Sequence, residues 1–129
     1  MSCTATTNPV KFQVQQNHTL RLSCLAHAAY TQKVTVSLDP SLSTPIAIFQ
    51  GSGEGVPMKS DGQELIDIFT GGNEALYILF QFSNGGAFQN AIRVCEPQTI
   101  GSLTQIMSED STDRDDNDSY LSIIDRTAT

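Results

Sequence analysis

Apolar and polar side chains alternate along most of the sequence. Alternating runs cover residues 20–24, 33–38 and 91–95, and residues 75–82 are rich in aromatic and large aliphatic side chains. A period of two places every second side chain on the same face of a strand, whereas a helix repeats its apolar positions every three or four residues. Helical periodicity is hard to find, so the pattern predicts a chain of short β-strands.

Turn-forming residues separate these runs. Glycine, proline, aspartate and asparagine gather at residues 39–40, 51–55, 71–73 and 84–85. Asn84-Gly85 is the strongest hairpin signal, because both residues tolerate the positive φ of a type I′ turn. Strands that follow one another this closely predict an all-β fold, an antiparallel β-sandwich of eight or nine strands.

The organisation along the chain is simple. Residues 60–71 suit either a short helix or a strand, and we favour a strand because the flanking glycines leave little room for a helix. The length of 129 residues suits one domain with one core. We predict a loose polar tail over residues 1–10 and a single binding domain over residues 11–129.

The charge is concentrated in one place. The chain carries a net charge of −7, and six of its 14 acidic residues lie within residues 108–118. The rest of the chain is close to balanced, which argues against nucleic acid as a partner, because phosphate binding needs a basic surface. No apolar run approaches the ~20 residues of a membrane span, so we expect no membrane insertion.

The N-terminus shows neither the basic region nor the apolar region of a secretory signal. We therefore expect a protein that is made in the cytoplasm. Release to the cell surface or the extracellular space by a non-classical route is the open alternative.

The three cysteines, Cys3, Cys24 and Cys95, cannot all pair within the chain, and none has the C-x-x-C spacing of a zinc or redox site. Cys24 and Cys95 lie inside apolar runs, where a buried free thiol is the commoner state. We expect both to be free and buried, and Cys3 to be exposed in the polar leader.

Catalytic motifs are weak. His18 and His27 are the two histidines of the chain, and neither neighbours a nucleophile motif such as G-x-S-x-G. Residues 51–55, GSGEG, lack the Lys-Ser/Thr of a phosphate loop and are typical of a turn. The sequence therefore predicts a binding protein with no catalytic residues, not an enzyme.

The side chains that could bind a ligand are most concentrated in residues 108–118, SEDSTDRDDND. Asp113, Asp115 and Asn117 stand at alternate positions, and closely packed carboxylates repel one another unless a cation neutralises them. Alternating oxygen ligands in a tight loop suit a hard cation such as Ca²⁺. The run begins like an EF-hand, but it has Asp118 where that loop needs glycine, which excludes an EF-hand. A solvated acidic loop without an ion is the alternative.

Residues 108–124, SEDSTDRDDNDSYLSII, resemble the calcium loop of the bacterial calcium-dependent fucose/mannose-binding lectins, a two-calcium family. The loop of that family has the approximate pattern S-E-D-G-T-D-x-D-x-N-D before a strand. Residues 11–39 resemble its opening hairpin, including an A-N-x-x-x-T-Q-x-V-x-V stretch, and residues 60–85 resemble its middle strands. The resemblance implies a nine-stranded sandwich, in agreement with the strand pattern.

The resemblance also implies a site for two Ca²⁺ ions per chain. The implied metal ligands are Glu109, Asp113, Asp115, Asn117, Asp118, the backbone of His27 and the carboxylate of Thr129. Asp115 and Asp118 would bridge the ions, and His27 stands where the family has an asparagine. The terminal glycine carboxylate of the family completes a neighbour's site, and here Ala128 holds that place with Thr129 one residue beyond it.

In this family, sugar hydroxyls coordinate both ions directly, which selects the stereochemistry of mannose- and fucose-like rings. The implied sugar-binding residues are Asp110, Ser111, Asp113, Asp115, Asn117, Asp118 and a specificity loop of Ala28, Ala29 and Tyr30. Fucose-preferring members begin that loop with serine, so Ala28 implies a shift towards mannose, while Tyr30 would add stacking area or block the site.

We therefore expect a calcium-dependent lectin that binds mannose- or fucose-containing glycans. A homodimer or homotetramer would carry several sites and convert weak binding at each into avidity. The alternative from another class is a calcium-stabilised structural or adhesion module of the same fold that has lost sugar binding.

Overall fold

The computed structural model describes residues 3–109 and 118–127. The strands follow in this order: β1 (Val10–Gln13), β2 (Thr19–Ser37), β3 (Pro45–Pro57), β4 (Ile66–Phe69), β5 (Ala75–Ser83), β6 (Gln89–Asn90), β7 (Arg93–Val94), β8 (Gln98–Ile100), β9 (Leu103–Glu109) and β10 (Ser119–Asp125). Within the described ranges there is no helix that is long and apolar enough to span a membrane. The all-β prediction is confirmed, with ten strands in place of nine.

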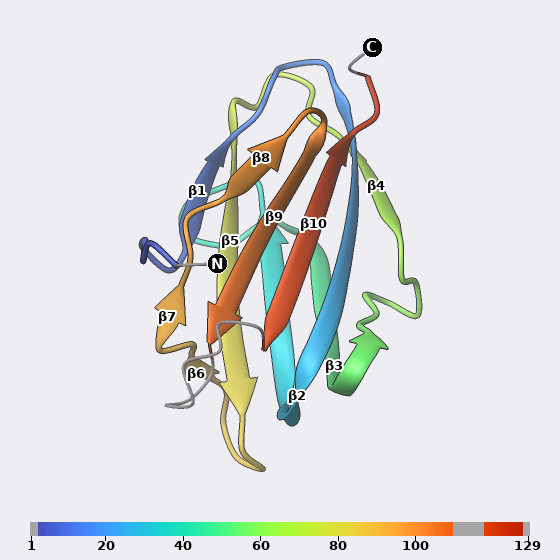
Figure 1. Ribbon diagram of the computed structural model, residues 1–129. Helices are drawn as coiled ribbons and strands as arrows, with labels where there is room; N and C mark the ends of the chain where they lie inside the picture. The colour runs from blue at the N-terminus through green and yellow to red at the C-terminus, as the bar shows by residue number, and fades with distance from the viewer. Residues whose placement is uncertain (1–2, 110–117, 128–129) are drawn as a thin grey trace.

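The strand pairs are antiparallel and belong to one continuous sheet. The main path runs β1-β5-β2-β10-β9-β7, and β3, β4, β6 and β8 pair at its sides. The sheet curls over on itself, so that β9 and β10 lie in front of β5 and β3 in Figure 1. The fold is a nearly closed, barrel-like version of the predicted sandwich.

β2 is the strand that both layers share. Its first part, residues 19–26, pairs with β4 and β10, and its last part, residues 31–37, pairs with β5. β3 pairs with residues 25–28 and 32–37. Its pairing with β3 shifts register twice within residues 26–32, and such irregularities bend a strand. We call residues 27–31 the crossing, because they carry the chain from one layer to the other.

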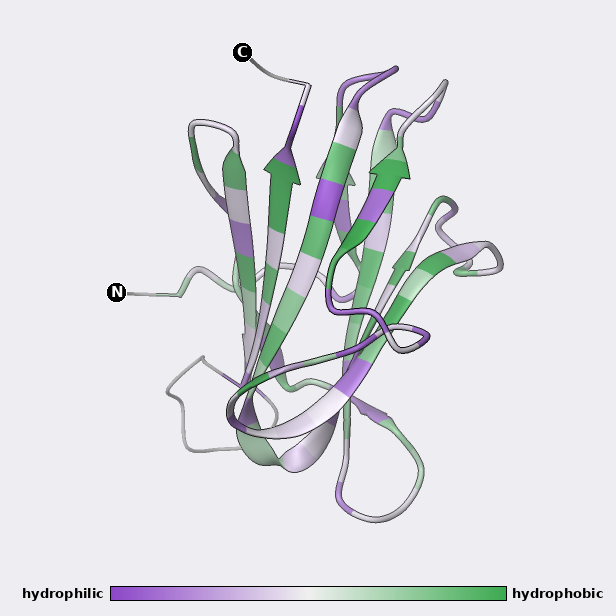
Figure 2. Cartoon of the chain, turned by 90° about the vertical axis from the view of Figure 1, so that its right-hand side faces the viewer, coloured by the Kyte–Doolittle hydropathy of each residue, from purple (hydrophilic) through white to green (hydrophobic). Residues whose placement is uncertain are grey.

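The alternation in the sequence becomes the inner and outer face of this sheet. Along β2, Leu20, Leu22, Cys24 and Ala26 are buried, and the residues between them are more exposed. Figure 2 shows the same banding of hydrophobic and hydrophilic residues along the strands. Burial raises the pKa of the Cys24 thiol, which is free as predicted and is kept in its unreactive protonated form.

Residues 3–9 are attached to the sheet, which differs from the predicted loose tail. Cys3 forms a disulfide with Cys95. The Asn8 side-chain amide both donates to Phe80 O at 2.9 Å and accepts from Phe80 N at 3.0 Å. The predictions of a free Cys95 and an exposed Cys3 are therefore wrong. The two cysteines are 92 residues apart in the sequence, and only the folded topology brings them together.

Two segments with turn signals fold nearly as the sequence indicates. The strand favoured for residues 60–71 is confirmed, because β4 lies inside that segment and pairs with β2. Asn84-Gly85 lies in the loop between β5 and β6, which pair as an antiparallel hairpin. Gly85 has a φ of 85° but Asn84 does not share a positive φ, so the turn is not type I′.

Candidate functional site

The acidic segment, residues 108–118, connects the end of β9 to the start of β10, and these two points are neighbours in the sheet. Glu109 is the last residue of β9, and Asp118 directly precedes β10. Asp118 N donates to Ser108 O at 2.9 Å, and Ser108 pairs with Ser119 across the two strands. Glu109 is 0% exposed and Asp118 is 3% exposed. Carboxyl groups from both ends of the acidic segment are therefore held inside the fold.

The crossing of β2 lies against this point. His27 N donates to Asp118 O at 2.9 Å, and the preceding residue, Ala26, pairs with Ser119 in β10. In Figure 1 the lower end of β2 lies at the end of the molecule where β9 finishes and β10 begins. Two segments that are far apart in the sequence thus meet at one end of the sheet.

A buried amide connects the crossing to β10. Gln32 is 1% exposed, its Nε2 donates to Tyr30 O at 3.3 Å, and its Oε1 accepts from Ser119 Oγ at 2.9 Å. A buried amide is stable only when it is hydrogen-bonded, so these contacts fix the side chain in one orientation. Gln32 therefore holds the crossing at a set position relative to the start of β10.

The crossing presents small and aromatic side chains. Ala28 is buried and Ala29 is exposed. The Tyr30 ring stacks on Phe82, with the ring centroids 5.9 Å apart and an interplanar angle of 16°. Because Phe82 is itself buried, the stacking anchors the crossing to the body of the sheet.

The His27 side chain has partners of its own. Its ring centroid lies 5.0 Å from that of Tyr120, and its Nδ1 lies 3.9 Å from Glu54 Oε2. Its backbone N–H, in contrast, bonds to the Asp118 carbonyl. The imidazole and the backbone of His27 thus have separate surroundings, and the backbone is the part that adjoins the acidic segment.

The donor set at this end fits a hard cation. Carboxylate oxygens are the ligands that Ca²⁺ prefers, and buried carboxylates are costly unless they are paired or bind a metal. Ser108 Oγ, next to Glu109, is buried and has no hydrogen-bond partner among the described residues. Within residues 3–109 and 118–127, no three His, Cys, Asp or Glu side chains gather into a metal site. The other side-chain ligands predicted from this loop, Asp113, Asp115 and Asn117, lie outside the described residues.

The predicted site residues divide into two groups. Those that the structure describes come together at this end of the molecule: His27, Ala28, Ala29, Tyr30, Glu109 and Asp118. Those that lie outside the described residues are Asp110, Ser111, Asp113, Asp115, Asn117 and Thr129. The roles of both groups as metal or sugar ligands stay predictions.

Two residues that the sequence analysis does not single out belong to the same place. Gln32 and Ser119 are buried polar residues, and they bond to each other. Gln32 lies two and four residues before the buried Val34 and Val36, so it falls on the same inner face of β2. A polar side chain at an apolar position of the alternation is the signal in the sequence that could have found it.

Solved structures of bacterial lectins have a similar fold. The Chromobacterium violaceum lectin CV2L in complex with alpha-methyl-fucoside matches with a TM-score of 0.65 and 21% identity, over 92% of this chain and 96% of that chain. The Ralstonia solanacearum high-affinity mannose-binding lectin gives 0.62 and 23%, over 88% and 92%. The C-terminal domain of the BC2L-C lectin from Burkholderia cenocepacia gives 0.60 and 20%, over 91% and 94%. At these identities the likeness establishes the fold.

The sequence itself establishes the family. No curated protein sequence matches the chain significantly. A sequence profile of the fucose-binding lectin II (PA-IIL) family matches residues 12–125, a range that contains both the crossing and the acidic segment. The match confirms the resemblance noted from the motifs and the prediction of a lectin in place of an enzyme. The chain belongs to the fucose-binding lectin II (PA-IIL) family.

Proposed function

We propose that the chain is a calcium-dependent lectin that binds mannose- or fucose-type sugar residues where the crossing meets the acidic segment. The observation that carries this proposal is the joint burial of Glu109 and Asp118 beside the crossing. Glu109 and Asp118 offer carboxylate oxygens at both ends of the acidic segment, and such oxygens are the ligands that Ca²⁺ prefers. The family match and the fucoside and mannose lectins of similar fold support it.

Side chains and one backbone group of the chain would coordinate two Ca²⁺ ions. Side-chain oxygens would come from Glu109, Asp113, Asp115, Asn117 and Asp118. Asp115 and Asp118 would serve both ions, and His27 would offer its backbone carbonyl, since its imidazole has other partners. When bound, the ions supply coordination positions that neighbouring sugar hydroxyls fill. Asp110 and Ser111 would orient the sugar by accepting or donating hydrogen bonds.

The side chains of the crossing would set the preference among sugars. Ala28 and Ala29 carry no hydroxyl, so they offer no side-chain hydrogen bond to a ligand. Tyr30 is held in place by its stacking on Phe82, and its ring offers an apolar plane. We therefore expect mannose-type residues to bind more tightly than fucose-type residues.

We further propose that the active form is a homodimer or homotetramer. Several sites on one particle would raise the avidity for a glycan-coated surface well above the affinity of a single site. Sedimentation equilibrium with calcium and with chelator tests this, and a monomer under both conditions would contradict it.

We place the working compartment outside the reducing cytoplasm, after synthesis in the cytoplasm and release by a non-classical route. The Cys3–Cys95 disulfide supports this, because disulfides persist in oxidising environments. Thiol titration of protein recovered from the culture medium should find Cys24 as the free thiol. Recovery of the protein only from the cytoplasm, with all cysteines reduced, would contradict the proposal.

The rival function is a calcium-stabilised structural or adhesion module that has lost sugar binding. Mannose- and fucose-coupled resins separate the two functions. The lectin should be retained in calcium and eluted by chelator. A melting temperature that rises with calcium, without retention on either resin, would favour the rival. No response to calcium at all would leave a solvated acidic loop.

A pair of variants within the acidic segment sharpens this experiment. Asp115→Ala should abolish both the calcium-induced rise in melting temperature and the retention on resin, because this position would bridge the ions. Asp116→Asn removes a charge from the neighbouring position, which we assign to neither ion, and should keep both properties. Equal losses in the two variants would show that general acidity, and not a ligand set, is what matters.

A further inference from the structure

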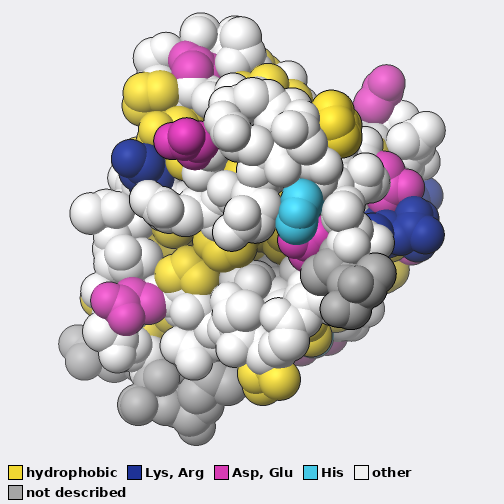
Figure 3. Space-filling view, turned by 90° about the horizontal axis from the view of Figure 1, so that it is seen from above, with side chains coloured by type: hydrophobic (Ala, Val, Ile, Leu, Met, Phe, Trp, Pro, Cys, Tyr) yellow, Lys and Arg dark blue, Asp and Glu magenta, His cyan; other side chains and the backbone are white. Residues whose placement is uncertain are grey.

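A cavity of about 310 Å³ lies at the end of the molecule opposite the acidic segment. β10 runs between the two places, from Ser119 beside the acidic segment to Asp125, which lines the cavity. A strand of this length spans about 20 Å, so the cavity is a separate place from the proposed calcium site. Figure 3 looks down on this end and shows hydrophobic side chains inside a hollow between polar walls.

The floor of the cavity is apolar. Leu20 and Ile123 are core residues, 3% and 2% exposed, and they line the cavity from below. Phe12 and Val14, at the end of β1, pack against the same core and form one side. The opposite wall comes from the hairpin between β8 and β9. The cavity thus opens along the seam where the curled sheet does not close.

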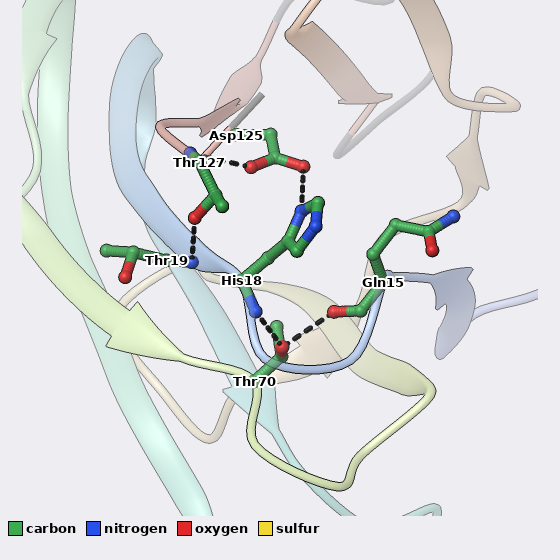
Figure 4. Close-up of polar contacts among 6 residues, drawn as sticks. All are labelled: Gln15, His18, Thr19, Thr70, Asp125 and Thr127. Atoms are coloured by element: carbon green, nitrogen blue, oxygen red, sulfur yellow. Dashed lines mark hydrogen bonds and ion pairs between the residues drawn. The ribbon is translucent and has the colours of Figure 1, made fainter. Parts of the chain in front are cut away.

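The rim on one side is polar and fixed by contacts between distant segments (Figure 4). His18 Nδ1 lies 2.7 Å from Asp125 Oδ2, and Thr127 N donates to Asp125 Oδ1 at 3.0 Å. Buried Thr70 accepts from His18 N at 2.9 Å and donates to Gln15 O at 2.6 Å. These bonds hold the rim in a preformed shape, which is the usual state of a small-molecule site.

The charge of the lining is one-sided. Asp125 is the acidic residue of the lining, and no lysine or arginine lines the cavity among the described residues. His18 contacts one oxygen of the Asp125 carboxylate but does not line the cavity. Thr99 and Thr104, joined by a contact of 2.8 Å between their hydroxyl oxygens, add neutral polar groups on the β8–β9 wall. An anionic ligand would meet like charge, and a cationic group would meet a carboxylate at the rim of an apolar floor.

We propose that this cavity is a second ligand site, for a small amphiphile with an ammonium head and a short hydrocarbon body. The head would lie at Asp125 and the hydrocarbon over Leu20 and Ile123. The volume lies at the small end of the range of ligand pockets, which fits a body of a few carbon atoms. The site needs neither calcium nor the acidic segment, so it stands or falls separately from the lectin function.

A matched set of probes tests this proposal. Hexylammonium, hexanol and hexanoate share one hydrocarbon body and differ in head charge. In two-dimensional NMR titrations of the full chain, hexylammonium should shift the amide signals of Ser102, Thr104 and Asp125, and should bind at least about fivefold more tightly than hexanol. Hexanoate should bind most weakly. No shift at these residues with any probe, or equal affinity for all three, would overturn the proposal.

Three variants assign the effect to the cavity. Asp125→Asn should make the affinities for hexylammonium and hexanol equal, whereas Asp61→Asn, which removes a charge from an exposed turn, should leave the preference intact. Thr99→Trp, on the exposed edge strand β8, should weaken hexylammonium at least about tenfold by filling the mouth, with an unchanged melting temperature. A preference for hexylammonium that survives both Asp125→Asn and Thr99→Trp would overturn the proposal. Calcium-dependent retention on sugar resin should stay unchanged throughout.

Discussion

An aspartate stands at each end of β10: Asp118 directly precedes the strand, and Asp125 is its last residue. The two ends differ in how far apart in the sequence their functional side chains lie. Asp118 closes a segment whose other carboxylates are its immediate neighbours. Asp125 bonds to His18, which lies 107 residues away along the chain, and to the backbone of Thr127. At the acidic end the acidic side chains come from one short segment, although the topology brings the crossing against it. At the other end the topology of the sheet supplies the contacts as well as the walls.

The difference follows from what each end has to do. Ca²⁺ takes several oxygen ligands and tolerates irregular geometry, so a single short loop can supply most of them. An apolar cavity needs walls from several strands, and no short stretch of sequence contains those walls. The acidic end is therefore visible as a motif, while the cavity end is invisible until the strands are paired.

Replacing Asp118 or Asp125 singly by alanine should give the largest contrast in sugar affinity. Asp118→Ala should lower the sugar affinity at least about 100-fold, because it removes a ligand proposed for both ions. Asp125→Ala should leave the sugar affinity within about twofold, since it lies far from the site, but should cost about 1–3 kcal/mol of stability by removing the partner of His18. Calorimetric sugar titration and urea denaturation of both variants check this, and an equal loss of sugar affinity would refute the division into two ends.

The disulfide should matter next, and chiefly for stability. Cys3→Ser should lower the free energy of unfolding by about 2–5 kcal/mol, because the bond closes a long loop of the unfolded chain. Urea denaturation should show the same loss when the wild-type chain is reduced. The reductant should do nothing more to the variant, and a wild-type chain indifferent to reductant would contradict the observed pairing.

The acidic end should also depend on a buried amide at the base of the crossing. Gln32→Ala should cost about 1–3 kcal/mol, because Ser119 Oγ and Tyr30 O lose a partner inside the fold. We expect the sugar affinity to fall as well, since the crossing would no longer be held against β10. Gln32→Met fills a similar volume without polar atoms and is the matched control, which separates the lost hydrogen bonds from the lost volume. A variant destabilised without any change in sugar affinity would show that Gln32 serves packing alone.

The smallest effect lies at neither end, in the exposed turn after β2. The pKa of Asp39 is held well below its usual range by hydrogen bonds from the hydroxyls of Ser41, Ser43, Thr44 and Ser37. The unfolded chain therefore binds the proton more tightly, so this stabilisation is present above about pH 4 and is lost as the pH falls further. Between about pH 5 and pH 3 the melting temperature should fall less steeply for Asp39→Asn than for the wild type. Parallel curves would contradict this.

Much of the fold follows from the alternation of side chains. The buried row from Leu20 to Ala26 and the strand inside residues 60–71 come directly from local pattern. The long course of β2 does not, because the crossing interrupts the alternation and separates what reads as two strands. The Cys3–Cys95 bond was missed for a related reason, since pairing over that distance depends on which strands become neighbours.

The candidate site divides in the same way. Glu109 and Asp118 were identified because their neighbours are acidic too, and the crossing was identified through a family motif. Gln32 and Ser119 were not identified, because the role of a single polar residue in an apolar row cannot be inferred before its hydrogen-bond partner is known. The sequence motif thus predicts the ligands, whereas the contacts that hold them emerge only from the fold.

The most direct test of the central claim is a pair of calorimetric titrations on the full chain. Calcium is titrated into the metal-free protein, and methyl mannoside is then titrated into the calcium-loaded protein and into a sample with chelator. Two calcium ions should bind per chain, and the sugar should give heat only when calcium is present. Sugar binding that is unaffected by chelator, or a chain that takes up no calcium, would contradict it.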